Sequence, residues 1–182
     1  MNNLIFLQNF FADYSVSCIV ISIIISLIVC LIDKFSIKGI IAKLNYALPF
    51  ILGISFNFVY NLIIGQINSN GAQVVSAGFM SGSLSFAMKV IVSSFLKGES
   101  LPESKTAIII TGLIQGYVSK NDVESSVKFI EELFVEGQGI EETQIVAEIA
   151  LHLSQASMQD LSEGDITALA TLIYASVKQT KE

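Results

Sequence analysis

The stretch that decides the fold lies at residues 15–32 and reads SVSCIVISIIISLIVCLI. It carries no charge, and twelve of its eighteen residues are Ile, Val or Leu. On a membrane-insertion scale those twelve residues contribute about −4 to −7 kcal/mol. Because an isolated strand in lipid leaves its backbone groups unpaired, this β-branched stretch predicts a membrane-spanning helix.

A second charge-free region follows at residues 44–88. It is too long for one span, and it is divided by a cluster of Gly, Asn and Ser at 65–71 that is typical of a turn. We therefore expect two further spans at 44–64 and 72–95. With the first span they make a membrane domain over residues 1–97.

The remaining residues, 98–182, have a different composition. They carry five Lys against fourteen Asp or Glu, a net charge of −9, whereas residues 1–97 carry five Lys against two Asp, a net of +3. The charge-free run at 106–119 is too short for a span and suits a buried core helix. Three amphipathic stretches follow it, and Ser162 with Asp165 marks the start of the last one. Their apolar stripes are Val123, Val127, Ile130 and Phe134, then Ile145, Ile149, Ala150 and Leu153, then Ile166, Leu169, Ala170, Ile173 and Val177. The prediction is an all-α protein, with three transmembrane helices followed by a small acidic, soluble domain of about four short helices.

The lysines predict the orientation of the membrane domain. They occur in the 33–43 loop and at the end of the third span, and none occurs in the N-terminal tail or the 65–71 turn. The positive-inside rule then places the N-terminus outside and the C-terminal domain in the cytosol. A chain rich in Ile and Asn and free of Arg suggests an AT-rich genome, and hence a bacterial cytoplasmic membrane.

Each predicted span carries small or polar side chains along one face. Such a stripe can pack against another helix of the same chain, contact another copy, or line a water-filled path, and all three roles are open. Lys89 either extends to the inner interface, pairs with Asp33, or faces a wet lumen. The candidate helix-packing or pore-lining residues are Ser22, Ser26, Gly53, Asn57, Asn61, Gly78, Gly82, Ser85 and Lys89.

The inventory of catalytic residues is nearly empty. The chain has a single histidine, His152, with no phosphate-binding loop and no Cys/His set spaced for a metal. Cys18 and Cys30 are twelve residues apart, about 18 Å along a helix, which is too far for a disulfide. We predict no active site, no metal and no cofactor. The lack of Arg and the acidic C-terminal domain argue against nucleic-acid binding.

The layout of residues 1–97 resembles three-span phage holins, which have the N-terminus outside and the C-terminus inside. The segments YALPFILG at 46–53 and SAGFMSGSL at 76–84 also resemble short membrane proteins of prophages. The holin resemblance itself lies in the layout of the spans. It implies a protein that accumulates in the inner membrane, oligomerises and opens lesions. Such holins end in a short basic tail, whereas this chain carries an acidic helical domain over 98–182, which indicates an added regulatory or assembly role.

These observations predict a non-enzymatic, self-associating inner-membrane protein, holin-like or pore-forming, with a cytosolic regulatory domain. Its expected partners are membrane lipid and further copies of the chain. One alternative is a membrane-anchored scaffold whose acidic domain recruits a cytosolic protein. Another is a subunit of a membrane transport or secretion complex.

Overall fold

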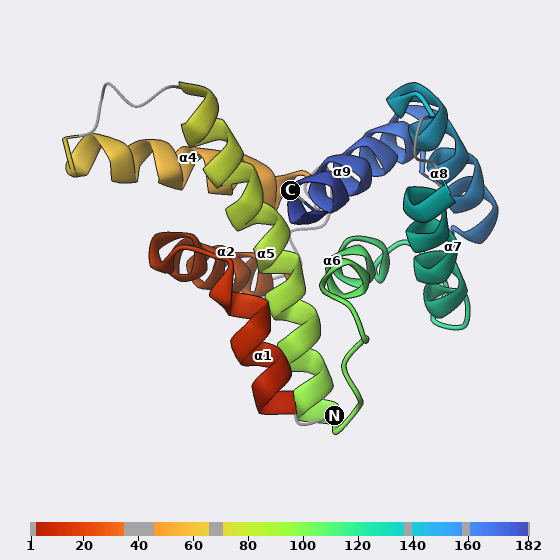
Figure 1. The fold of residues 1–182 in the computed structure, drawn as a ribbon, viewed down its shortest axis with the longest axis horizontal. Helices are drawn as coiled ribbons and strands as arrows, with labels where there is room; N and C mark the ends of the chain where they lie inside the picture. The colour runs from red at the N-terminus through yellow and green to blue at the C-terminus, as the bar shows by residue number, and fades with distance from the viewer. Residues whose placement is uncertain (1–2, 35–45, 66–70, 137–139, 158–160, 182) are drawn as a thin grey trace. The chain divides into compact units, whose positions relative to one another are not determined.

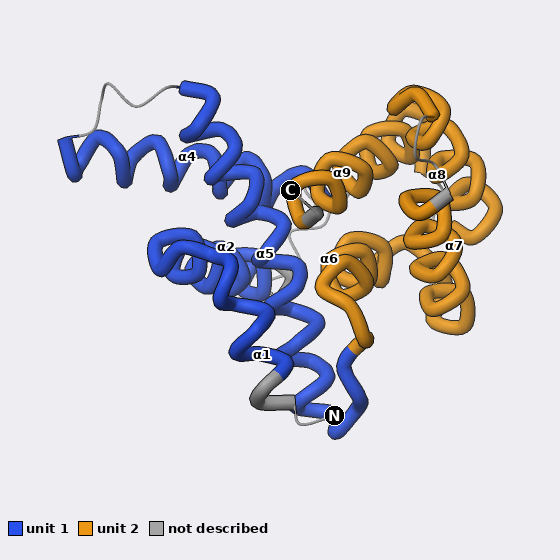
Figure 2. Tube along the Cα trace, in the orientation of Figure 1, with its two compact units in different colours: residues 1–101 blue, residues 102–182 orange. Residues whose placement is uncertain are grey.

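A computed structural model describes residues 3–34, 46–65, 71–136, 140–157 and 161–181, and this part of the chain is helical, which confirms the predicted all-α class (Figure 1). The chain divides into two compact units, residues 1–101 and 102–182 (Figure 2). The helices of unit 1 are α1 (Asn3–Ala12), α2 (Val16–Lys34), α4 (Leu48–Ile63) and α5 (Gly71–Lys97). Those of unit 2 are α6 (Lys105–Ile114), α7 (Val123–Glu136), α8 (Glu142–Ala156) and α9 (Glu163–Lys181).

Unit 1 is built around α5, which packs against both α2 and α4, while α2 and α4 also contact each other. The three helices cross steeply, with α4 lying across α5 and α2 running nearly along the line of view in Figure 1. They do not form the near-parallel bundle that three adjacent spans would suggest. The apolar contact between α2 and α4 consists of Ile21, Ile25 and Val29 packed against Leu48, Leu52 and Phe56.

Three membrane spans are not supported by the lengths of the described helices. Only α5 is both long and apolar enough to cross a membrane, and a second candidate exists if 6–12 and 16–32 count as one span bent by 110°. The apolar part of α2 rises about 25 Å and the 16 residues of α4 about 24 Å, both short of a ~30 Å hydrocarbon core. The lysine-bearing loop and the 65–71 turn lie largely outside the described residues.

Unit 2 has α6 at its centre. This helix contacts α7 and α9, and α8 completes the unit by contacting the same two helices. Residues 107–110 of α6 are all buried, which confirms the predicted core helix. The predicted apolar stripes of the other three helices face the core as well. Their buried members are Val127 and Ile130 on α7, Ile145, Ile149 and Leu153 on α8, and Leu169, Ala170, Ile173 and Val177 on α9.

Side-chain caps begin two of these helices. Ser104 accepts a hydrogen bond from the backbone N–H of Ala107 at 2.8 Å, and its hydroxyl donates to Glu131 of α7, which ties α6 to α7. The expected start of the last helix at Ser162 is confirmed. The N–H of Asp165 donates to Ser162 Oγ at 3.2 Å, and the N–H of Ser162 donates back to the Asp165 carboxylate at 3.3 Å. This reciprocal arrangement is a capping box.

Candidate functional site

The most distinctive site in the structure is a set of buried polar contacts where α2, α4 and α5 meet, here called the polar seam (Cys18, Ser26, Asn57, Ser81 and Ser85). At its centre Asn57 Nδ2 donates to Ser81 Oγ at 3.1 Å and to the Gly53 carbonyl oxygen at 3.0 Å. Ser81 Oγ also lies 3.3 Å from Cys18 Sγ. One serine of α5 therefore joins the other two helices.

The Ser81 hydroxyl has one proton, so it can donate to only one of its neighbours in the polar seam. The Ser81 hydroxyl lies 2.9 Å from the Ala77 carbonyl oxygen, a shorter contact than the one to Cys18. A hydroxyl has one proton and can accept two hydrogen bonds. With its proton directed to Ala77, Ser81 accepts from Asn57, and the Cys18 thiol supplies the proton of the remaining contact. Asn57 Nδ2, Ser81 Oγ and Cys18 Sγ are then all engaged in contacts inside the chain.

A second contact of the polar seam links α2 to α5. The Ser26 hydroxyl donates to the Ser85 carbonyl oxygen at 2.9 Å, while the Ser85 hydroxyl donates within α5 to the Gly82 carbonyl oxygen at 2.7 Å. Ser22 is fully buried and donates to the Ile19 carbonyl oxygen of its own helix at 2.7 Å. Asn61 is half-buried and donates to the Asn57 carbonyl oxygen.

Glycines let α4 and α5 approach backbone to backbone. A Cβ atom at Gly53 would lie 2.1 Å from the Gly78 carbonyl oxygen, and one at Gly78 would lie 2.4 Å from Ile54 Cα. A Cβ at Gly82 would lie 2.8 Å from Phe50 Cα. Since the atoms in the way belong to the backbone, no side-chain rearrangement can make room. The crossing therefore requires glycine at all three positions.

The nine predicted residues fall into two groups. Six of them lie where two helices of this chain touch. Of the others, Ser22 and Asn61 bond within their own helices, and Lys89 is exposed. The Asp33 side chain lies outside the described part, so its expected pairing with Lys89 is not described. The six contact residues are Ser26, Gly53, Asn57, Gly78, Gly82 and Ser85.

The sequence reasoning missed Ser81, the residue that joins all three helices. A signal for it was present, because Ser81 lies three residues after Gly78 and four before Ser85, on the face that those two residues define. Cys18 lies four residues before Ser22, on the same face of its helix, and was likewise not selected. Both are buried in the structure.

The outer surface of unit 1 has the opposite character to the polar seam. Large apolar side chains are exposed along the three helices, while Asn57, Ser81 and Ser85 are at most 4 % exposed. In water-soluble proteins large apolar side chains lie mostly inside and polar ones outside. The exposed set comprises Val16, Val20, Ile23, Ile24, Leu27 and Leu31 on α2, Ile51, Phe58, Val59, Leu62 and Ile63 on α4, and Val75, Val92, Phe95 and Leu96 on α5.

Unit 2 contains one arrangement that has the geometry of a nucleophile and its base. His152 Nε2 lies 3.0 Å from Ser126 Oγ. Burial lowers the pKa of His152, and the negative charge of Asp122 opposes that shift. Ser126 is fully buried, and Phe129 stacks on the histidine ring with centroids 4.2 Å apart. A substrate cannot reach a hydroxyl in this position, so the pair joins two helices and has no access for hydrolysis.

The described residues contain no group of three or more His, Cys, Asp or Glu placed to hold a metal ion. Comparisons with protein-family models, with curated proteins and with solved structures found no match to this chain.

Proposed function

We propose that the protein is a non-enzymatic membrane scaffold: unit 1 is a self-packed membrane anchor, and the acidic unit 2 recruits a protein partner. The observation that carries this proposal is the outer face of unit 1, where many large apolar side chains of α2, α4 and α5 are exposed. The polar side chains Asn57, Ser81 and Ser85 are buried beneath that face, beside the apolar core. An apolar outer face suits lipid, whereas in water it would expose a large hydrophobic patch.

The polar seam also favours a closed anchor over a channel. A pore needs polar side chains that face water, but Asn57, Ser81 and Ser26 are used in contacts between helices of one chain. Interhelical hydrogen bonds of this kind stabilise membrane helices by about 0.6–2 kcal/mol each. The seam therefore supports a stable trio of helices that needs no second copy.

The proposal keeps the predicted topology. The helices α2, α4 and α5 each enter the bilayer, the N-terminus lies outside, and unit 2 lies in the cytosol of a bacterial cell. The lysine distribution supports this orientation, and α5 supplies the span of sufficient length. The steep crossing of α4 over α5 implies that the shorter helices enter at a tilt or with local thinning of the bilayer.

A holin-like, self-associating membrane protein is the second candidate. The observation that favours it is Lys89, which is exposed on α5 about 12 Å by helical rise from the end of that helix at Lys97. A lysine on the outer face of a membrane helix needs a polar environment, at the interface, in water or against other side chains. Association of copies along this face would cover it.

Controlled expression in a bacterium distinguishes the two candidates. The culture carries a membrane-potential dye and a cytosolic reporter enzyme, and carbonate-washed membranes are assayed for the protein. A scaffold is expected to remain in the washed membranes while the potential and the reporter stay unchanged. Abrupt depolarisation with release of the reporter would contradict the scaffold and support the holin-like candidate. Recovery of the protein in the carbonate supernatant would contradict both.

A further inference from the structure

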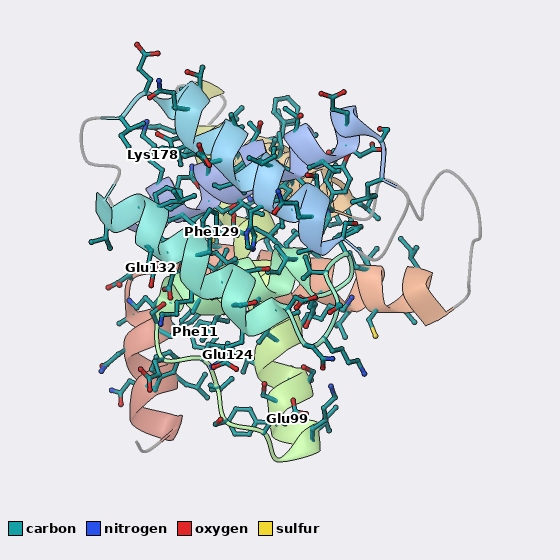
Figure 3. All side chains as sticks on the ribbon, turned by 90° about the vertical axis from the view of Figure 1, so that its right-hand side faces the viewer. Phe11, Glu99, Glu124, Phe129, Glu132 and Lys178 are labelled. Carbon is teal, nitrogen blue, oxygen red and sulfur yellow. The ribbon has the colours of Figure 1, made fainter. Side chains whose placement is uncertain are left out.

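Three side chains join α7 to α8 in unit 2, here called the α7–α8 latch (Ser126, Phe129 and His152). Ser126 Oγ lies 3.0 Å from His152 Nε2, and the histidine ring stacks on Phe129 with an interplanar angle of 16°. Phe129, the aromatic member of the latch, is labelled in Figure 3. Ser126 is fully buried, whereas His152 is partly exposed. A proton from solvent can therefore reach the histidine ring but not the serine.

The hydrogen bond of the latch has a direction. His152 Nε2 is the partner that the geometry gives the Ser126 hydroxyl, at 3.0 Å, and the tautomer of the histidine decides which of the two atoms donates. Because a buried donor without an acceptor is unfavourable, the hydroxyl proton points to Nε2, and that nitrogen must be unprotonated. The histidine is then neutral, with its proton on Nδ1.

We propose that the latch is a pH-sensitive device: a proton that binds His152 Nε2 removes the acceptor of the Ser126 hydroxyl and loosens α7 from α8. The two nitrogens of a protonated imidazole are both donors, so Nε2 and the hydroxyl would then present two protons to each other. The hydroxyl must rotate away or the helices must separate.

The surroundings keep the latch closed at neutral pH. Burial lowers the pKa of His152 below its ordinary value of 6.5, and the negative charge of Asp122 opposes that shift. The Asp122 carboxylate is itself engaged, because it accepts a hydrogen bond from the Ser119 hydroxyl at 2.6 Å. Within four residues of the latch along α7 and α8, the other charged side chains are Glu124, Lys128, Glu131, Glu132 and Glu148.

Opening the latch would increase the exposure of apolar side chains that are buried close to it in the chain. Ile130 on α7 and Ile149 on α8 are fully buried, and Leu153 lies one residue after the histidine. Acidification would therefore change the surface that unit 2 offers to a partner. The latch is confined to unit 2 and does not depend on the membrane role of unit 1.

A titration tests the first step directly, because the chain has one histidine. The full chain, labelled with ¹³C in histidine and held in lipid nanodiscs, gives a single ring signal that is followed from pH 8 to pH 5. We expect a midpoint below 6.5 and a neutral ring protonated on Nδ1. A midpoint at or above 6.5, or a neutral ring protonated on Nε2, would overturn the proposal.

Hydrogen exchange tests the second step. Amide exchange of residues 123–136 and 142–156, corrected for the intrinsic effect of pH, should increase about tenfold on acidification, the size expected when a buried donor loses its acceptor. His152→Gln, whose side-chain oxygen can still accept from Ser126 but does not titrate here, should abolish that increase. Glu124→Gln, an exposed change on the same helix, should preserve it. An equal increase in His152→Gln would refute the latch.

Discussion

Gly53→Ala is the change that most directly tests the close contact of α4 and α5. The added Cβ would lie 2.1 Å from the Gly78 carbonyl oxygen, against the 3.4–4 Å of ordinary contact, so the two backbones must separate by more than 1 Å. Such overpacking costs about 1–3 kcal/mol. The polar seam lies on the same crossing, since Asn57 is one turn further along α4 and donates to Gly53 itself.

Cys18 provides the assay, because it is 4 % exposed in the polar seam and the only other cysteine, Cys30, is exposed. In a Cys30→Ser background a fluorogenic maleimide reports how often the seam opens. A loss of 1–3 kcal/mol corresponds to labelling that is roughly 5- to 150-fold faster. Gly71→Ala on α5 is the matched control, because a Cβ there meets nothing within 4 Å. Equal labelling rates in the two variants would refute the requirement for glycine at the crossing.

Three further predictions follow from the same geometry. Asn57→Ala should raise Cys18 labelling by the equivalent of about 0.6–2 kcal/mol, whereas Asn61→Ala, which loses only a bond within its own helix, should raise it less. Ser162→Ala should destabilise α9 by about 1 kcal/mol, measured as faster amide exchange in its first turn, with Ser154→Ala on the exposed face of α8 as the control. The pKa of His152 is lower in the folded protein than its ordinary value of 6.5. The histidine therefore leaves the free energy of unfolding of unit 2 unchanged above pH 6.5 and lowers it as the pH falls below 6.5. Denaturation at stepped pH should show this loss in the wild type, and the loss should be smaller in His152→Gln.

The sequence was most informative where one residue pattern decides one element. The span predicted at 72–95 matches α5 to within two residues at each end, and the Ser162 capping signature marked the start of α9. In unit 2 the apolar spacing of each amphipathic helix selected the residues that are buried, because helical periodicity alone decides which face is apolar.

Contacts between helices could not be predicted from the same patterns. A stripe shows which face of a helix is suited to packing, but the partner of that face depends on how the helices cross. The steep crossing of α4 and α5 results from three glycines on two helices, and Ser81 gains its role only from Asn57 and Cys18 around it. The bend between α1 and α2 likewise has no periodic signal.

The His152 contact was missed for a related reason. The residue lies at the edge of an apolar stripe, which is typical of an ordinary surface histidine. Its partner Ser126 is 26 residues away in the chain, on another helix. Ser126 does lie on the face that Val127 and Ile130 define, so burial of its hydroxyl could have been anticipated, but the identity of the acceptor could not.

The central claim, that the outer face of unit 1 lies in lipid, is tested most directly by comparing two leucines of equal exposure. Leu27 on α2 is 61 % exposed and Leu151 on α8 is 57 % exposed. In a background of Cys18→Ala and Cys30→Ala, Leu27→Cys and Leu151→Cys are reacted with a charged maleimide in lipid nanodiscs, where both sides of the bilayer are open to reagent. The account predicts fast labelling at position 151 and little at position 27 until detergent and denaturant are added. Equally fast labelling at the two positions in intact nanodiscs would show that the apolar face of α2 lies in water, and would contradict the account.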